Sequence, residues 1–241
     1  MTKRLMKIRQ VFLDILFPPI CLNCRAYLQT LEEKENLLCH PCFSGISIYS
    51  NIFRPELQFK LAAIGSYGTS ALRELLHYFK YNGFLAARIP LEKLIVRWSE
   101  TNPNLIPSIL APSSCVVPIP LHKNRLRERG FNQAEIISEI LGRHLNLPVE
   151  KNLLERIRET KSQIKMGSVK EREANVKASI QVREGEKATL SRYRSIILVD
   201  DIYTSGSTMR EAAKALRQGL RLSSAECPGI KNITTFVIAK T

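Results

Sequence analysis

The chain has 241 residues, of which 44% are hydrophobic and 24% are charged. A chain of this length can bury one good core and carry a small extra module, and its ordinary composition excludes wholesale disorder. Its 36 Lys and Arg outnumber its 22 Asp and Glu and give a formal net charge of +14. That charge predicts an anionic partner, namely nucleic acid, a phosphorylated metabolite or an acidic membrane surface, although a merely solvated basic surface would carry the same charge.

The N-terminal segment MTKRLMKIRQVFLDILFPP begins with a basic cluster, but Arg9, Gln10 and Asp14 interrupt its apolar stretch and no small-residue cleavage site follows. Apolar residues recur in it at helical spacing: Leu5, Ile8, Phe12 and Ile15 or Leu16. We expect a retained amphipathic helix that packs on its own protein, with binding to a membrane surface as the weaker alternative. No run approaches the roughly 18 apolar residues that a membrane span needs, so we expect a cytoplasmic protein.

Four of the six cysteines form two C-x-x-C pairs: Cys21, Cys24, Cys39 and Cys42. Two residues between cysteines let both thiolates of a pair point at one ion, and two pairs complete a closed tetrahedral site typical of structural zinc. The alternatives are disulfides, which a cytosolic chain disfavours, or four ordinary buried thiols. His40 is interpreted as a spacer, because four sulfurs already fill the coordination sphere. Cys115 and Cys227 stand alone, and we expect both to be structural.

Beyond the cysteines and a polar stretch that ends near Pro55, the spacing of apolar residues predicts alternating strands and helices. Strands are predicted at 59–68 (with a turn), 115–120, 149–157, 194–202 and 233–241, and helices at 69–83, 84–100, 134–148 and 207–220. Residues 101–114 are predicted to be a surface connection, residues 121–133 a long basic loop, and residues 158–177 a charged polar stretch. Such alternation favours a parallel sheet covered on both faces, whose ligands bind beyond the carboxyl ends of the strands.

One predicted strand, SIILVDD, is an apolar run that ends in two carboxylates, Asp200 and Asp201. Small and hydroxylated residues follow and open a helix: Thr204, Ser205, Gly206, Ser207 and Thr208. Exposed backbone N–H groups, hydroxyl donors and the positive end of a helix dipole suit a phosphate, whereas carboxylates suit a polyol or a metal. A ribose with a 5-phosphate satisfies both halves. An ordinary helix N-cap is the alternative, but it explains only one or two of the hydroxyls.

ILVDDIYTSGST resembles the phosphoribosyl-pyrophosphate signature of type I phosphoribosyltransferases. Nearly the full length is similar to the ComF family of competence-associated, phosphoribosyltransferase-like proteins. LFPPICLNC with LCHPC resembles the family's zinc ribbon, HYFKYNG its helix with a Lys-Tyr pair, and PIPLHKNRLRERGFNQA its most distinctive motif. The resemblance implies an α/β architecture, a Rossmann-like type I phosphoribosyltransferase fold with a parallel sheet and flanking helices, in residues 56–241. Residues 1–55 would hold the amphipathic helix and a small four-cysteine zinc ribbon.

The resemblance also implies roles for individual residues. Asp200 and Asp201 would bind the ribose hydroxyls, and residues 204–208 would surround the 5-phosphate. The basic loop would bind pyrophosphate through Pro120, His122, Arg125, Arg129 and Gly130, with a solvated charge run as the alternative. A flexible catalytic loop that closes over the diphosphate and limits hydrolysis would contribute Arg156, Arg158, Thr160, Gln163, Arg172 and Asn175. Ile180 stands where the family usually has Phe.

Three functions fit these residues. The first is an enzyme that transfers phosphoribosyl from phosphoribosyl pyrophosphate to an unknown acceptor, with Mg²⁺ bound to the diphosphate. The second is a non-catalytic module that binds single-stranded DNA during natural transformation, alongside other competence proteins. The third is a metabolite-sensing regulator that uses the same site without catalysis.

Overall fold

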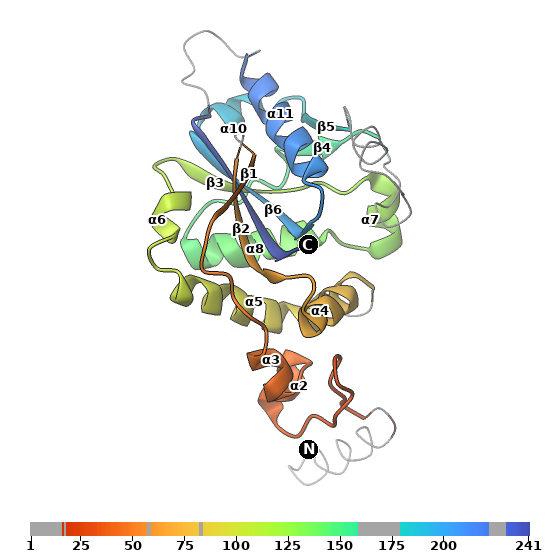
Figure 1. Cartoon of the computed structure of the whole chain (residues 1–241). Coiled ribbons are helices and arrows are strands. Elements are labelled where there is room, and N and C mark those ends of the chain that lie inside the picture. Colours follow the sequence, from red (N-terminus) through yellow and green to blue (C-terminus); the bar gives the residue numbers. More distant parts are fainter. Residues whose placement is uncertain (1–15, 17, 57–58, 82–83, 159–178, 222–229) are drawn as a thin grey trace, which may run out of the picture. The chain divides into compact units, whose positions relative to one another are not determined.

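The computed structural model describes residues 16, 18–56, 59–81, 84–158, 179–221 and 230–241 (Figure 1). The chain forms two compact units that interleave along the sequence. The first unit holds residues up to Ser47 together with Gly68–Pro90, and the second holds Ile48–Tyr67 together with Leu91–Thr241. A domain boundary near residue 55 stays a prediction, because compactness does not test whether either part folds alone.

The first unit contains two short helices around the second cysteine pair and one longer helix. Helix α2 (Leu31–Asn36) begins with a capping box, in which Thr30 Oγ1 accepts from the Glu33 backbone N–H at 3.1 Å and Glu33 Oε2 accepts from the Thr30 N–H at 3.2 Å. Helix α3 (His40–Ser44) follows. Helix α4 (Ser70–Tyr81) has the predicted apolar spacing and buries one side of itself through Ala71, Leu72, Leu75, Leu76 and Phe79.

The second unit is built on a five-stranded sheet in the order β1-β2-β7-β6-β3. The strands are β1 (Phe53–Glu56), β2 (Phe59–Ser66), β3 (Ser114–Pro118), β6 (Ser195–Tyr203) and β7 (Asn232–Lys240). Strands β2, β7, β6 and β3 are parallel, and β1 is an antiparallel edge strand. The mixed α/β class with a mainly parallel sheet is therefore confirmed. The prediction of a polar connection that ends near Pro55 was wrong in part, because β1 begins at Phe53. The Phe53 ring stabilises this strand by packing edge-on against Tyr49, with 5.1 Å between the ring centroids.

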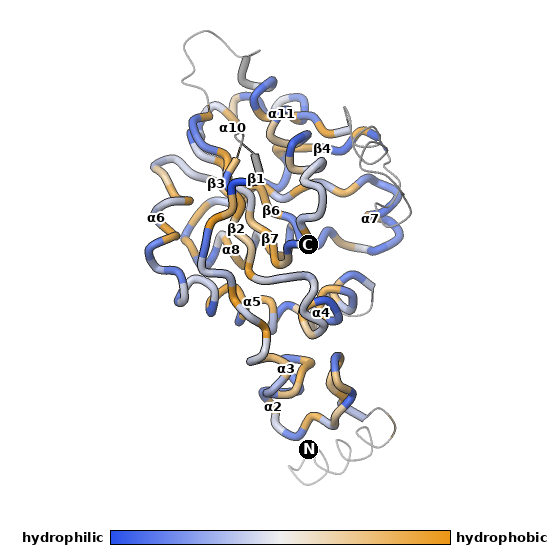
Figure 2. Tube along the Cα trace, in the orientation of Figure 1, coloured by the Kyte–Doolittle hydropathy of each residue, from blue (hydrophilic) through white to orange (hydrophobic). Residues whose placement is uncertain are grey.

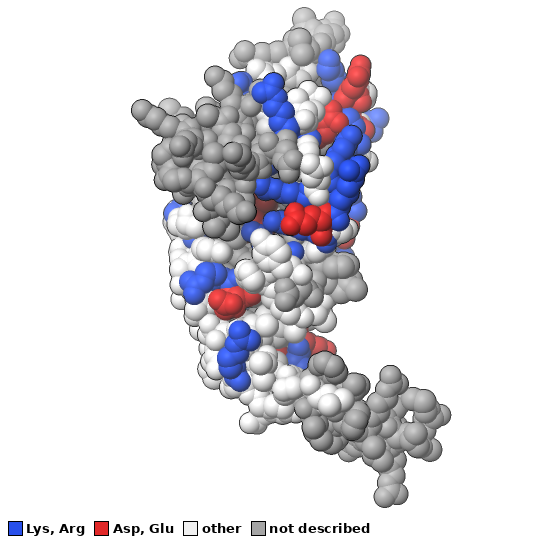
Figure 3. All heavy atoms as spheres, turned by 90° about the vertical axis from the view of Figure 1, so that its right-hand side faces the viewer, with Lys and Arg blue, Asp and Glu red and all other residues white. Residues whose placement is uncertain are grey.

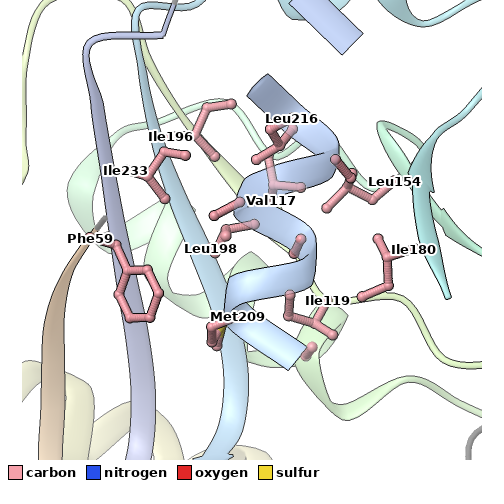
Figure 4. Close-up of a cluster of buried hydrophobic side chains, with 14 of the residues drawn as sticks. Phe59, Val117, Ile119, Leu154, Ile180, Ile196, Leu198, Met209, Leu216 and Ile233 are labelled. Carbon is pink, nitrogen blue, oxygen red and sulfur yellow. The ribbon is translucent and has the colours of Figure 1, made fainter. Parts of the chain in front are cut away.

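Helices cover both faces of this sheet, as predicted (Figure 1). Helix α11 (Ser207–Arg221) lies on one face, where its Met209 and Leu216 join a buried cluster with Leu198 and Ile196 of β6 (Figure 4). Helix α8 (Gln133–Leu145) and the part of α5 (Phe84–Thr101) that follows Pro90 cover the other face. On that face the Trp98 ring of α5 meets the Phe236 ring of β7 edge-on at 5.3 Å.

A two-stranded antiparallel hairpin packs beside α11. It consists of β4 (Leu154–Arg156) and β5 (Ile180–Val182), and helix α10 (Lys187–Ser191) follows it. Leu154 and Ile180 point into the same buried cluster from the hairpin side (Figure 4). The apolar side chain at position 180 therefore fixes the hairpin to the core. Strand β5 was not predicted, because its three residues are too few for a period to be recognised.

Two segments predicted as irregular contain short helices. Helix α6 (Ile106–Ile109) lies in the predicted surface connection, and helix α7 (Lys123–Arg129) replaces most of the predicted basic loop. Helix α7 has local start and stop signals: His122 Nδ1 accepts from the Asn124 N–H at 3.3 Å, and Gly130 takes the left-handed conformation at φ 77°. It is hydrophilic along most of its length (Figure 2), and this polarity led to the prediction of a loop. None of the described helices is both long enough and apolar enough to cross a bilayer.

Close packing of α8 on the following segment gives a test of the fold. A Cβ at Gly142 would collide with Val149 Cγ2 and lie 3.0 Å from the Leu147 carbonyl oxygen. Although alanine favours helices over glycine, we expect Gly142→Ala to lower the free energy of unfolding by about 1–2 kcal/mol, measured by urea denaturation. In a Val149→Ala background the same substitution should cost clearly less. If Gly142→Ala lowered the free energy of unfolding equally in the wild type and in Val149→Ala, the contact with Val149 would not be what requires glycine at position 142.

Candidate functional site

Two polar connections leave the same edge of the sheet. Strands β3 and β6 are parallel neighbours, with Pro118 opposite Val199, and the Ile119 N–H donates to the Val199 carbonyl at 2.9 Å. Because the carboxyl ends of parallel strands lie at a common edge, the segment after β3 (residues 119–132, the basic turn) and the segment after β6 (residues 204–208, the hydroxyl loop) leave the sheet at the same edge, although β6 extends four residues beyond the partner of Pro118. The two predicted phosphate-binding segments are thus neighbours.

Asp200 and Asp201 lie near the carboxyl end of β6, as predicted. Successive side chains of a strand point to opposite faces, so Asp200 lies on the α11 face with Leu198, and Asp201 lies on the face that α5 and α8 cover. Asp201 is 8% exposed, and its backbone N–H donates to Asp200 Oδ1 at 2.9 Å. The two carboxylates are therefore adjacent in the chain but leave the strand in different directions.

The hydroxyl loop is held in place by its own side chains. Ser205 Oγ and Ser207 Oγ are hydrogen-bonded at 3.1 Å, and Arg210 Nη1 donates to the Ser205 carbonyl at 3.0 Å. Gly206 has φ 72°, which glycine adopts readily, and a Cβ there would collide with the Tyr203 phenol. The loop opens α11 directly, so its backbone N–H groups lie at the positive end of a helix of 15 residues. This combination can bind an anion.

The basic turn presents its predicted residues on one side of α7. His122, Arg125 and Arg129 are spaced i, i+3 and i+7, which places them on a common helical face, and all three are half-buried. Lys123 and Arg127 point elsewhere and are exposed. The turn is therefore not a uniformly solvated charge run, because one face of it packs against the protein.

Three charged side chains from different elements act on one another at this edge. Burial lowers the pKa of the Arg156 guanidinium, the Asp200 carboxylate raises that pKa, and Arg125 lowers it. Arg156 comes from β4, Asp200 from β6 and Arg125 from α7. Arg156 reaches this position because it shares the inward face of the hairpin with Leu154, two residues earlier. Two guanidinium groups and one carboxylate leave a local excess of positive charge.

The other predicted residues divide into three groups. Pro120 and Gly130 bracket α7, where Gly130 is its exposed C-cap. Arg158 is exposed just after β4, so it does not share the half-buried position of Arg156. Thr160, Gln163, Arg172 and Asn175 lie outside the described residues.

Two residues of the basic turn and α8 were missed as site residues. Asn132 is 4% exposed: its Oδ1 accepts from the Ala134 N–H at 3.1 Å and its Nδ2 donates to the Ile119 carbonyl at 3.0 Å. Gln133 is 2% exposed, and its Oε1 accepts from Arg129 Nη1 at 3.2 Å. Asn132 thus caps α8 and also closes the basic turn. The N-cap preference of asparagine before an apolar helix was the signal that could have identified it.

The four predicted cysteines form a second candidate site, in the first unit. Their sulfur atoms all lie within 4.8 Å of one another, and the Cys24 and Cys39 sulfurs are 3.5 Å apart. Four sulfurs bound to one zinc at about 2.3 Å would be separated by distances of this size. Two left-handed residues, Arg25 and Leu37, turn the chain beside the cluster. The cluster can therefore hold one metal ion, and four thiolates suit zinc.

The local electrostatics of the cluster suit a cation. Burial raises the pKa of the Cys21 thiol, but backbone hydrogen bonds from Cys24, Cys39 and Asn23 outweigh this effect and lower that pKa to about 7. Burial raises the pKa of Cys39 and of Cys42, although the Asn23 side chain donates to Cys42 Sγ at 3.2 Å. One thiolate therefore forms readily, and a bound cation would displace the protons of its neighbours.

Basic side chains gather on the face of the second unit that carries α7. Figure 3 shows Lys and Arg side chains over the upper part of this view, with fewer acidic side chains among them. A face with this balance attracts polyanions over a distance of about one Debye length.

The chain is similar to proteins named for competence and DNA utilization. It is 30% identical over 219 residues to Competence protein F of Haemophilus influenzae, a match that covers 82% of this chain and 90% of that protein. It is 28% identical over 203 residues to Competence protein ComFC of Bacillus subtilis, covering 82% of this chain and 77% of that protein. It is also 31% identical over 101 residues to the DNA utilization protein YhgH of Escherichia coli, 42% of each chain. No protein-family model matches the chain.

The two hydrogen-bonding roles of Asn132 can be separated. Asn132→Ser keeps an oxygen that caps α8 but removes the amide, which donates to the Ile119 carbonyl and to Glu135 Oε1, whereas Asn132→Ala removes the oxygen as well. We expect the free energy of unfolding, measured by urea denaturation, to fall by about 1 kcal/mol for Asn132→Ser and by about 2 kcal/mol for Asn132→Ala. If serine restored full stability, the two hydrogen bonds of the amide would contribute nothing.

Proposed function

The chain belongs to the ComF family, and from that relationship we propose that it binds phosphoribosyl pyrophosphate at the carboxyl edge of its sheet and acts in DNA uptake. Its relatives carry names that refer to competence and DNA utilization. The reaction would be transfer of phosphoribosyl to an acceptor that the sequence does not identify. The proposal extends to the fold, a Rossmann-like type I phosphoribosyltransferase fold, which the parallel sheet and the strand-loop-helix unit from β6 to α11 support.

The observation that carries the proposal is the convergence of Arg125, Arg156 and Asp200 beside the hydroxyl loop. A ligand that fits this arrangement needs anionic groups for the guanidinium groups and hydroxyl groups for the carboxylates. It also needs a phosphate for the loop that opens α11. A ribose bearing a 5-phosphate and a 1-diphosphate meets all three needs in one molecule.

Each group then has a task. Asp200, on the α11 face, accepts hydrogen bonds from the ribose hydroxyls, and the hydroxyl loop binds the 5-phosphate. The same role for Asp201, which leaves the strand on the other face, stays a prediction. Arg125 and Arg129 bind the diphosphate, with His122 beside them, and Arg156 connects the sugar and diphosphate sides because Asp200 and Arg125 both act on it. Fixed guanidinium groups stabilise the negative charge that the diphosphate gains as its bond to C1 breaks. The roles of Arg158 and of the residues at 160, 163, 172 and 175 stay predictions.

Mg²⁺ is the expected companion of the diphosphate. Carboxylate, hydroxyl and phosphate oxygens are the ligands that this ion prefers, and Asp200 is a half-buried carboxylate beside the proposed sugar. When bound, the ion would neutralise charge on the diphosphate oxygens.

Binding of phosphoribosyl pyrophosphate is testable by calorimetry. We expect Mg²⁺-dependent binding that Asp200→Asn weakens about 10- to 100-fold, because a hydrogen bond to a charged group contributes about 1.5–3 kcal/mol. Glu155→Gln is the matched control, since that carboxylate lies on the outward face of β4, where Gln181 Nε2 donates to it at 2.7 Å. Equal affinity of the wild type and an Asp200→Asn, Asp201→Asn variant would exclude the proposed site.

A non-catalytic module for single-stranded DNA is the second candidate, and the net charge of +14 with the basic face around α7 favours it. An acceptor screen that follows pyrophosphate release separates the two candidates. Release that requires a particular base or amine and disappears in Asp200→Asn establishes the enzyme. Binding of phosphoribosyl pyrophosphate without release for any acceptor favours a binding role.

We also propose that the cysteine cluster holds a structural zinc ion. The donor set, the close approach of the sulfurs and the shortness of the segment 18–47, which limits the core that it can build, support this proposal. The ion would tie the two C-x-x-C segments together and stabilise the fold around them.

Purified protein is expected to contain about one zinc ion per chain by elemental analysis. Cys39→Ala should lose the metal and lower the melting temperature, because three sulfurs leave the tetrahedral site open. Cys115→Ala is the matched control: Cys115 is also buried, but it lies in β3 and should leave the zinc content unchanged. Wild-type protein without zinc would contradict the proposal.

A further inference from the structure

Helix α4 packs in the core with one side, and that packing does not account for the aromatic and basic residues on its exposed side. Its apolar side is buried, while Arg73, His77 and Tyr81 lie four residues apart along the opposite side. Lys80, three residues after His77, lies in the last turn of the same side. The side therefore carries two aromatic rings, with Arg73 one turn before His77 and Lys80 next to Tyr81.

The two rings form a tilted, exposed pair. The ring centroids of His77 and Tyr81 are 5.0 Å apart with an interplanar angle of 49°. Tyr81 is 56% exposed, and His77 is exposed as well. A tyrosine that packs on a histidine loses rotational freedom, so its ring is presented to solvent in a fixed direction. Such a ring binds a second flat ring at a low entropic cost.

The charge around this pair selects the kind of ligand. Residues 68–90 carry Arg73, Lys80 and Arg88 against one acidic residue, Glu74. Arg73 and Glu74 approach only to 3.8 Å and are both about half exposed, so their interaction is weak and Arg73 can contact an added anion. Residues 18–47, in contrast, carry two basic and three acidic residues: Arg25, Lys34, Glu32, Glu33 and Glu35. Of the two parts of the first unit that the structure describes, the part with the excess of positive charge is thus the one that carries the aromatic pair.

We propose that the His77–Tyr81 pair of α4 is a stacking platform for an unpaired base of single-stranded nucleic acid, with Lys80 and Arg73 binding the neighbouring phosphates. A base offers a flat face to the tyrosine, and the phosphates on either side of it are anions that basic side chains attract. A duplex hides its base faces in its own stack, so it can use only the cations. This inference deepens the DNA-handling role proposed above and assigns it a surface other than the ribose-phosphate site.

The test measures the affinity of full-length protein for a short fluorescein-labelled oligothymidylate by fluorescence anisotropy. Tyr81→Ala is expected to weaken binding about 5- to 150-fold, the range that stacking of one base on an aromatic side chain spans. Tyr81→Phe and Tyr81→Trp should bind like the wild type, because each keeps a ring. Tyr27→Ala is the matched control: Tyr27 is 50% exposed in the same unit but lies among the mainly acidic residues 18–47, so its loss should change nothing.

The salt dependence separates stacking from charge. Lys80→Ala should reduce the slope of log affinity against log salt concentration by about 0.7, as loss of one phosphate contact on a single strand does. Tyr81→Ala should leave the slope unchanged. The proposal is overturned if the wild type does not bind the oligonucleotide at low salt, if Tyr81→Ala and Tyr27→Ala bind equally well, or if Tyr81→Phe binds as weakly as Tyr81→Ala.

The ribose-phosphate site is tested separately from this surface. The anisotropy experiment contains no phosphoribosyl pyrophosphate, and calorimetry should show that Tyr81→Ala binds that ligand as the wild type does. A Tyr81→Ala variant that loses both ligands would overturn the platform, because loss of base stacking alone leaves binding of phosphoribosyl pyrophosphate intact. Failure of phosphoribosyl pyrophosphate binding in the wild type, with the tyrosine series behaving as expected, would exclude the first site and leave the platform standing.

Discussion

The parallel pairing of β3 with β6 is the constraint on which the candidate site depends. Pro118, the last residue of β3, stands opposite Val199, so the basic turn leaves the sheet beside Asp200, while β6 continues to Tyr203 before the hydroxyl loop begins. Hydrogen bonds between β3 and β6 fix the register of the two strands. A shift of β6 by one residue would turn Asp200 toward the other face of the sheet. The basic turn and the hydroxyl loop are neighbours for this reason, although about 70 residues of chain separate them.

The hydrophobic core extends this arrangement to a third segment. Helix α11 follows the hydroxyl loop and packs on β6, and the β4–β5 hairpin packs beside α11 through Leu154 and Ile180 (Figure 4). Arg156 shares the inward face of the hairpin with Leu154, so the apolar contacts bring a guanidinium group to Asp200. Packing of aliphatic side chains thus positions a charge that would be costly to bury alone.

The surroundings of Asp200 explain why a strongly basic chain places a carboxylate at the candidate site. Asp200 of β6 and Arg125 of α7 both act on the Arg156 guanidinium of β4, and the three side chains together keep a positive excess that suits a phosphorylated sugar. The aromatic pair on α4 belongs to the other unit and joins exposed rings to cations, a chemistry suited to bases rather than sugars. The two proposed surfaces therefore differ in the ligand chemistry that they would favour, a phosphorylated sugar at one and an unpaired base at the other.

Local sequence patterns were enough to predict the cysteine cluster and the carboxyl end of β6. The spacing of Cys21, Cys24, Cys39 and Cys42 predicted a cluster whose sulfurs do converge, and the apolar run before Asp200 predicted the end of a buried strand. Both are short-range features, because two residues of a C-x-x-C pair or a few residues of one strand suffice to define them. Helix α7 was missed because its polar residues have no apolar period, although His122 and Gly130 are local caps.

Only the tertiary structure decided which distant residues meet. The order β1-β2-β7-β6-β3 places the ends of β3 and β6 together, and no local pattern contains that order. The meeting of Arg125, Arg156 and Asp200 depends on it, as does the burial of Asn132 against Ile119. The exposure of Tyr81 was likewise beyond the sequence, since an aromatic residue at helical spacing is core or surface according to what packs on the helix. Long-range packing settles such questions because burial is a property of the assembled chain rather than of any segment.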